Sequence, residues 1–74
     1  MIKEIDLHGY TLEDAIDYVE REIGTIRLSG EEKDLLVITG RGVIRVELIK
    51  YLKKQDIFHQ YQLGNDGAII IHVD

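Results

Sequence analysis

The chain has 74 residues and contains no cysteine and no proline, so disulfide bonds and thiolate metal sites are excluded. Its length predicts one domain, residues 1–74, and no apolar run approaches the ~20 residues needed to cross a membrane. We therefore expect a cytoplasmic protein with no membrane partner. The net charge of −5 argues against indiscriminate binding to nucleic acid.

The charge is unevenly distributed along the sequence. Residues 41–54 contain five basic residues and one acidic residue, a local balance of +4. The rest of the chain contains four basic and thirteen acidic residues, a balance of −9. The basic segment is suited to binding phosphate groups, and it is equally suited to being a solvated helix face whose lysines lay their apolar stems along the surface.

The first predicted element is a strand at residues 2–7, where apolar and polar side chains alternate weakly before Gly9 ends the run. Thr11 is a favourable helix N-cap, and acidic residues follow it in the first turn, where the helix dipole favours negative charge. Apolar residues then recur at helical spacing, which predicts a helix from about residue 12 to about residue 28 and a loop at 29–32. The expected buried face consists of Leu12, Ala15, Ile16, Val19, Ile23 and Ile26.

The second half of the chain begins with an almost continuous apolar run at residues 34–39, which is typical of a strand in the centre of a sheet. The glycine-rich turn Gly40-Arg41-Gly42 follows and leads into the basic segment. Residues 64–67 include types that tolerate positive φ, so they are expected to reverse the chain. The remaining predicted elements are a helix at about 43–54, a strand at about 57–63 and a strand at 68–73.

This order, β-α-β-α-β-β, predicts an α/β (α+β) two-layer sandwich with a four-stranded mixed sheet. Helical crossovers make the first three strands parallel, and the tight turn makes the fourth strand antiparallel to the third. Both helices are then expected to cover one face of the sheet. The carboxyl ends of the first two strands open onto the same edge, where open α/β folds usually bind their ligands.

Asp6 and His8 leave the first strand at that edge. An imidazole exchanges protons near neutral pH, which suits general acid–base chemistry, and a neighbouring carboxylate can orient it. Side chains two residues apart on a strand point the same way, so the two groups are candidates for one site. The same pair also suits a structural role, in which His8 bonds to the backbone at the end of the strand and Asp6 caps the turn.

The Gly40-Arg41-Gly42 turn leaves the second strand at the same edge. Backbone N–H groups at the start of a helix attract anions, and glycines let a phosphate approach the main chain. Arg41 adds a bidentate donor. The turn lacks the Gly-Lys-Ser/Thr ending of a Walker loop, and an ordinary tight turn is the alternative interpretation.

The remaining histidines and tyrosines are interpreted as structural. His59 and His72 lie in the last two predicted strands, where they could face each other across the hairpin, but three scattered histidines make a poor metal site. No metal ligands are therefore assigned. Packing residues are expected at Tyr10, Tyr51 and Tyr61, rather than platforms for stacking bases.

Four stretches taken together resemble the Smr domain, the small MutS-related family. Its first hallmark is Asp-Leu-His-Gly at the end of a strand, here Asp6-Leu7-His8-Gly9, and its second is Thr/His-Gly-Lys/Arg-Gly, here Thr39-Gly40-Arg41-Gly42. The family's Leu-Arg…Trp-Leu helix is similar to Ile44-Arg45…Tyr51-Leu52. Its closing Gly-Gly-x-Gly-Ala turn is similar to Gly64-Asn65-Asp66-Gly67-Ala68, so the four motifs occur in order along nearly the whole chain.

The resemblance implies a fold similar to the C-terminal domain of bacterial translation initiation factor three, with strand order 1-2-4-3. It also implies nucleic-acid binding and endonuclease activity: nicking of DNA or cleavage of RNA, in mismatch repair, recombination or ribosome rescue. DNA or RNA, the ribosome, or a larger MutS2-type protein are then the expected partners. The family's motifs carry over to Asp6, Leu7, His8, Gly40, Arg41 and Gly42.

Two functional hypotheses follow. In a nuclease, His8 would act as general base or acid, oriented by Asp6, while the glycine-rich turn holds the phosphate with Arg45 and Lys50. RNA cleavage by the substrate's own 2′-hydroxyl needs no metal, whereas DNA nicking makes a divalent ion such as Mg²⁺ at Asp6 plausible. The alternative is a non-catalytic adaptor that binds nucleic acid or the ribosome through the same edge. A purely structural protein-binding module would need neither His8 nor Arg41.

Overall fold

The computed structural model describes residues 2–62, 64–65 and 67–74. It contains two helices that alternate with the first strands and a final pair of strands, in the predicted order β-α-β-α-β-β. The elements are β1 (Ile2–Asp6), α1 (Leu12–Ser29), β2 (Lys33–Ile38), α2 (Val43–Lys54), β3 (His59–Tyr61) and β4 (Ala68–Val73).

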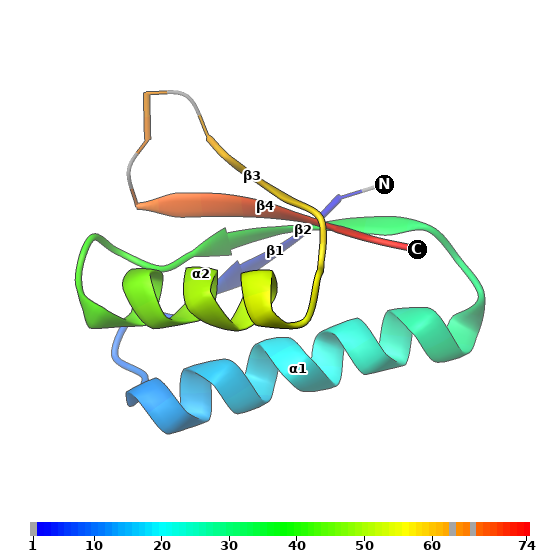
Figure 1. The fold of residues 1–74 in the computed structure, drawn as a ribbon, viewed down its shortest axis with the longest axis horizontal. Coiled ribbons are helices and arrows are strands. Elements are labelled where there is room, and N and C mark those ends of the chain that lie inside the picture. The colour runs from blue at the N-terminus through cyan, green and yellow to red at the C-terminus, as the bar shows by residue number, and fades with distance from the viewer. Residues whose placement is uncertain (1, 63, 66) are drawn as a thin grey trace.

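The four strands form one mixed sheet in the order β1-β2-β4-β3. β1 pairs with β2 in parallel, so that Asp6 lies opposite Ile38, and β4 runs antiparallel to both β2 and β3. The two helices lie together on one face of this sheet (Figure 1). The α+β fold class, the two layers and the strand order 1-2-4-3 are therefore confirmed.

The core lies between the sheet and the helices, and it is filled by alternate residues of each strand. Ile5 and Leu7 from the first strand and its end, Leu35 and Val37 from β2, and the alternate residues 69, 71 and 73 of β4 are buried in this core. Each fully buried aliphatic side chain contributes roughly 1.5–3 kcal/mol. Because residues alternate between faces, Asp6 projects from the uncovered face. Helical residues that complete the core are Ala15, Val19, Ile23, Ile26, Leu48 and Leu52.

The predicted strand at 57–63 is too long at both ends, because β3 comprises only His59–Tyr61. The chain first has to return from the end of α2 to the sheet. The N–H of Ile57 donates to the carbonyl of Leu52 at 2.9 Å, and Asp56 adopts a positive φ of 57°. The predicted positions Leu63 and Asp66 lie outside the described residues.

Elsewhere the boundaries agree closely with the sequence pattern, since α2 and β4 have their predicted limits and α1 ends one residue later, at Ser29. Leu12 is more exposed than the helical pattern predicted, because it begins the helix at the edge of the sheet. Within the part of the chain that the structure describes, neither helix combines the length and the apolar character needed to span a bilayer.

Candidate functional site

Three loops meet at one edge of the sheet. The N–H of Leu7, just after β1, donates to the carbonyl of Ile38 at 2.9 Å, so the exits of β1 and β2 are neighbours. The N–H of Thr39 donates to the carbonyl of Gly67 at 2.7 Å, which adds the chain entering β4. These loops lie at the left end of the molecule in Figure 1. We call this edge the rim: residues 6–10, residues 39–45 and Gly67, which precedes β4.

At the rim, Asp6 shapes the turn that presents His8. Its Oδ1 accepts the backbone N–H of His8 at 2.9 Å, and Gly9 follows with φ +82°, a conformation that favours glycine. Both Asp6 and His8 are exposed. The His8 imidazole has no hydrogen-bond partner among residues 2–62, 64–65 and 67–74, so the ring is open to a ligand. The observed bond is the one expected for a capping Asp6.

The glycine-rich turn is held rigidly against the turn before β4. Thr39 is only 7% exposed, and its hydroxyl donates to the carbonyl of Gly40 at 2.7 Å. The N–H of Gly40 donates to the carbonyl of Gly67 at 3.1 Å, and Gly40 itself has φ +72°. A Cβ on Gly67 would lie 3.7 Å from the Cα of Gly40. Thr39 and Gly67 thus fix the turn. The sequence did not reveal this role, because it depends on contact between two loops that are distant in sequence.

The start of α2 is uncapped. Gly42 is its N-cap residue and provides no side-chain hydrogen bond to the described first turn, which also contains no acidic residue. The first N–H groups of a helix have no partner within it and carry a partial positive charge. Arg41 is exposed beside them. This part of the rim therefore attracts anions through backbone and side chain together.

Arg45 is anchored in the rim, whereas Lys50 lies outside it. The Nη1 of Arg45 donates to the carbonyl of Ala68 at 3.3 Å, and its guanidinium carbon lies 5.4 Å from the centroid of the Tyr61 ring. Lys50 pairs with Glu47 at 3.7 Å on the exposed surface of α2. At 1.5 Å per residue, it lies roughly 10 Å along the helix from its start.

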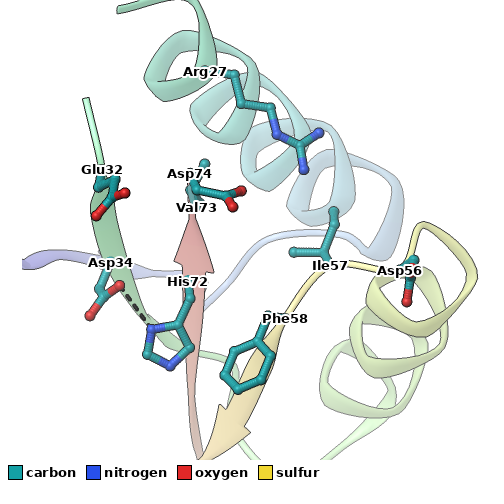
Figure 2. Close-up of a pocket in the computed structure, with 9 residues that line it drawn as sticks. All are labelled: Arg27, Glu32, Asp34, Asp56, Ile57, Phe58, His72, Val73 and Asp74. Atoms are coloured by element: carbon teal, nitrogen blue, oxygen red, sulfur yellow. Dashed lines mark hydrogen bonds and ion pairs between the residues drawn. The ribbon is translucent and has the colours of Figure 1, made fainter. Parts of the chain in front are cut away.

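The other two histidines do not face each other, in contrast to the geometry considered for the hairpin. His72 lies in a hollow at the opposite end of the sheet, where Nδ1 is 2.9 Å from Oδ1 of Asp34 and Nε2 is 3.0 Å from Oε1 of Gln60 (Figure 2). Nδ1 of His59 lies 2.8 Å from the carbonyl of Ile57. Both rings are tied into the strand framework, which distinguishes them from His8.

The tyrosines differ from the packing role expected for all three. Tyr51 is half-buried against the core as predicted, and burial raises its pKa above the ordinary value of 10.0. Tyr10 is exposed, although its ring lies 5.6 Å from that of Tyr18. Tyr61 is 55% exposed, so its assignment to packing is wrong. It lies on an edge strand whose outer side has no covering element among the described residues.

A metal ion at the rim would have few protein ligands, as is usual for Mg²⁺, which keeps several waters. No three His, Asp or Glu side chains in the described parts of the chain are placed to hold an ion together. Asp6, the only carboxylate considered for Mg²⁺, already accepts a main-chain N–H. The groups that the rim offers to a phosphate are an imidazole, a guanidinium and main-chain amides.

The fold corresponds to a known class of domain. The crystal structure of the Smr domain of Thermus thermophilus MutS2 matches with a TM-score of 0.81 at 22% identity, covering 97% of this chain and 98% of that one. The human small-MutS related domain matches with a TM-score of 0.79 at 24% identity, covering 95% and 99%. These similarities establish the fold.

The family follows from the sequence comparisons. The Smr domain model matches residues 5–74, and the chain belongs to the Smr domain family. It is 37% identical over 65 residues to Endonuclease MutS2 of Acetivibrio thermocellus, a match that covers 86% of this chain. The chain spans only 8% of the length of that relative.

Proposed function

We propose that this domain binds nucleic acid at the rim and cleaves a phosphodiester bond, with His8 as the proton-transferring group. One observation carries the proposal. The exposed ring of His8 and the uncapped, basic start of α2 follow two neighbouring strands, β1 and β2, at the same edge of the sheet. The similarity to Endonuclease MutS2 and the family's association with nucleic acid support it.

Binding of the phosphate uses three kinds of donor. The first amides of α2 and the main chain of Gly40 and Gly42 approach the phosphate oxygens, and Arg41 supplies a bidentate contact. Arg45 contributes positive charge from a fixed position. Lys50, about two turns along the helix, would contact a neighbouring phosphate of the same strand. Donors held in place before the reaction stabilise developing charge without reorganising.

The chemistry that these residues support best is cleavage of RNA. His8 takes the proton of the 2′-hydroxyl, and the resulting oxygen attacks the adjacent phosphorus to form a 2′,3′-cyclic phosphate. The bond from phosphorus to the 5′ oxygen breaks, and the leaving oxygen takes up a proton from water. Arg41 and the amides of the rim stabilise the extra negative charge on the phosphorus centre. DNA has no 2′-hydroxyl to act as an internal nucleophile, so its nicking would need an activated water molecule in addition to these groups.

The test is a cleavage assay with an unstructured RNA and a supercoiled plasmid, each with and without chelator. We expect RNA cleavage that persists in chelator. His8→Ala should lower the rate by at least about 100-fold, the usual contribution of a general acid or base. Arg41→Ala should lower kcat/KM by about tenfold or more, through both kcat and KM, because the charge-assisted hydrogen bond holds the phosphate and stabilises its developing charge. His72→Ala is the matched control, since that ring lies at the opposite end of the sheet, and it should leave the rate unchanged.

Cleavage that survives His8→Ala would contradict the catalytic role of His8. Binding without cleavage would favour the adaptor function, which one observation supports: Asp6 bonds to the main chain of His8 and not to its ring. In either function we propose that residues 1–74 act as one domain. Tethering within a larger MutS2-type protein or at a ribosome would raise the effective concentration of this acidic domain near its substrate.

A further inference from the structure

Strand β3 carries two aromatic rings on one side, and neither belongs to the core. Tyr61 and His59 are two residues apart, so they share a face of the strand, and their ring centroids are 6.1 Å apart. Tyr61 is 55% exposed and His59 is partly exposed. The buried residues of this region are Ile57, Ile69 and Ile71, so the rings are not required to fill the interior.

Arg45 connects these rings to the rim. Its guanidinium lies over the Tyr61 ring at 5.4 Å, and the same group donates to the carbonyl of Ala68. The tyrosine ring is thereby held beside the start of α2 while most of the residue remains open to solvent. A cation–π contact of this kind fixes the ring without covering both of its faces.

The seam between α2 and β3 carries a further cation, Lys53, and the hollow there is also lined by the carboxylate of Asp56. His59 and Lys53, in the last turn of α2, line a shallow hollow together. The ring of His59 is itself fixed by the carbonyl of Ile57 at 2.8 Å. From the rim outward, the seam thus presents Arg45, Tyr61, His59 and Lys53, so that two neighbouring rings lie between two cations.

We propose that Tyr61 is a stacking platform for an unpaired base, with His59 receiving the next base of the same strand. This inference rests on the proposed function, in which the phosphate of that strand is bound at the start of α2. Basic surfaces with exposed aromatic rings are the usual means of binding single strands, because every base has a face that can stack. Bases inside a duplex are already stacked, so the ligand class is single-stranded nucleic acid.

The test is the affinity of the full chain for labelled, non-cleavable oligonucleotides. Oligo-deoxythymidine and 2′-O-methyl oligouridine represent the two sugar chemistries, and a duplex of matched length is compared with them. Tyr61→Ala should weaken binding of both single strands by about tenfold, the usual effect of removing one stacking ring. Duplex binding should not change. Tyr61→Phe should bind like the wild type, because stacking uses the ring and not the hydroxyl.

Phe58→Ala is the matched control. Phe58 is 66% exposed and lines the hollow shared by His59 and Lys53, but its ring packs beside His72, 5.0 Å between centroids (Figure 2). The variant should leave binding unchanged. An NMR measurement on the wild type does not depend on how the variants fold. Bound bases should shift the ring-proton resonances of Tyr61 upfield, and those resonances are assigned by comparison with Tyr61→Phe.

Normal single-strand binding by folded Tyr61→Ala, or unshifted Tyr61 resonances in the wild-type complex, would overturn the platform while leaving phosphate binding at the rim intact. Failure of the wild type to bind any of the oligonucleotides would overturn the proposed function and the platform together. Loss of duplex and single-strand binding alike in Tyr61→Ala would show that the ring supports the rim and does not stack on a base.

Discussion

The two helices begin at the same edge of the sheet, but their first turns are built in opposite ways. At α1, the hydroxyl of Thr11 accepts the N–H of Asp14, and both Glu13 and Asp14 complement the helix dipole. At α2, Gly42 provides no such bond within the described residues, and Arg41 precedes it. The start of α1 is thus satisfied by its own sequence and repels anions, whereas the start of α2 attracts them.

The difference concerns stability as well as the proposed binding. A Ser, Thr, Asp or Asn cap contributes typically about 1 kcal/mol, and α2 lacks it. Its place in the fold is secured instead by Leu48 and Leu52, which are fully buried. A helix that is held by its middle can leave its first amides to a ligand.

A carboxylate introduced at the start of α2 should produce the largest change, because it would make this helix start resemble that of α1. Gly42 has φ −98° and no atom within 4 Å of the position a Cβ would take, so Gly42→Asp fits sterically. It should raise the unfolding free energy by roughly 0.5–1 kcal/mol as a new cap. It should also weaken single-strand binding by about tenfold or more, because it places a negative charge among the phosphate donors.

Thermal denaturation and oligonucleotide binding measure these two opposed changes. The control is Glu13→Gln, which removes a charge from the start of α1 and should leave binding unaltered. Unimpaired binding by Gly42→Asp would show that phosphate does not reach the start of α2.

The second effect concerns the two threonines that precede the helices. Thr39→Val removes the hydroxyl that clamps the glycine-rich turn, and it should lower the unfolding free energy by about 1 kcal/mol, the net value of one hydrogen bond. It should also weaken binding, because the turn loosens. Thr11→Ala should cost about the same stability through loss of the α1 cap, with binding intact. Equal binding by the two variants in a filter or anisotropy assay would remove the functional distinction between the two helix starts.

The smallest effect is expected at alkaline pH, where each helix has one sensitive contact. The hydrogen bond and charge of Glu22 on α1 raise the pKa of Lys3 above its ordinary 10.5, and burial, followed by the charge of Glu20, raises the pKa of Tyr51 on α2 above 10.0. In both cases the folded protein holds the proton more tightly than the unfolded chain does. Stability is therefore complete below these ordinary values and falls as the pH rises above them.

Melting temperatures across this range should fall less steeply for Lys3→Met and for Tyr51→Phe than for the wild type. The comparison is made after each variant is normalised to its own melting temperature at neutral pH. Parallel alkaline slopes for all three proteins would contradict the assigned contacts.

The fold was predictable because periodicity and caps act locally. The strand at 68–73 and the helix at 43–54 were bounded correctly from apolar spacing and flanking glycines alone. β3 was not, because Ile57 is apolar yet packs as the chain leaves α2, before the strand begins. A buried apolar residue can lie in a strand or in the loop that leads to the strand, and the sequence pattern does not distinguish the two.

The site was predictable only in part. The spacing of Asp6 and His8 was compatible with a carboxylate that orients the imidazole and with one that caps the turn. The structure shows a carboxylate–imidazole contact between Asp34 and His72, which are distant in sequence and opposite each other in the sheet. Asp6 instead bonds to the main chain. Tyr61 is exposed because β3 lies at the edge of the sheet. Which strand lies at the edge is set by the topology of the whole chain and not by the residues around Tyr61.

The central claim is that the His8 turn and the start of α2 together bind one phosphate group of a nucleic-acid strand. Amide and imidazole resonances can be followed by NMR while a non-cleavable oligonucleotide is added. If the claim holds, the amides of residues 40–45 and the ring of His8 will shift with a common midpoint, and the amides at the start of α1 will not move. Separate midpoints, or shifts confined to the hollow around Asp34 and His72, would contradict it.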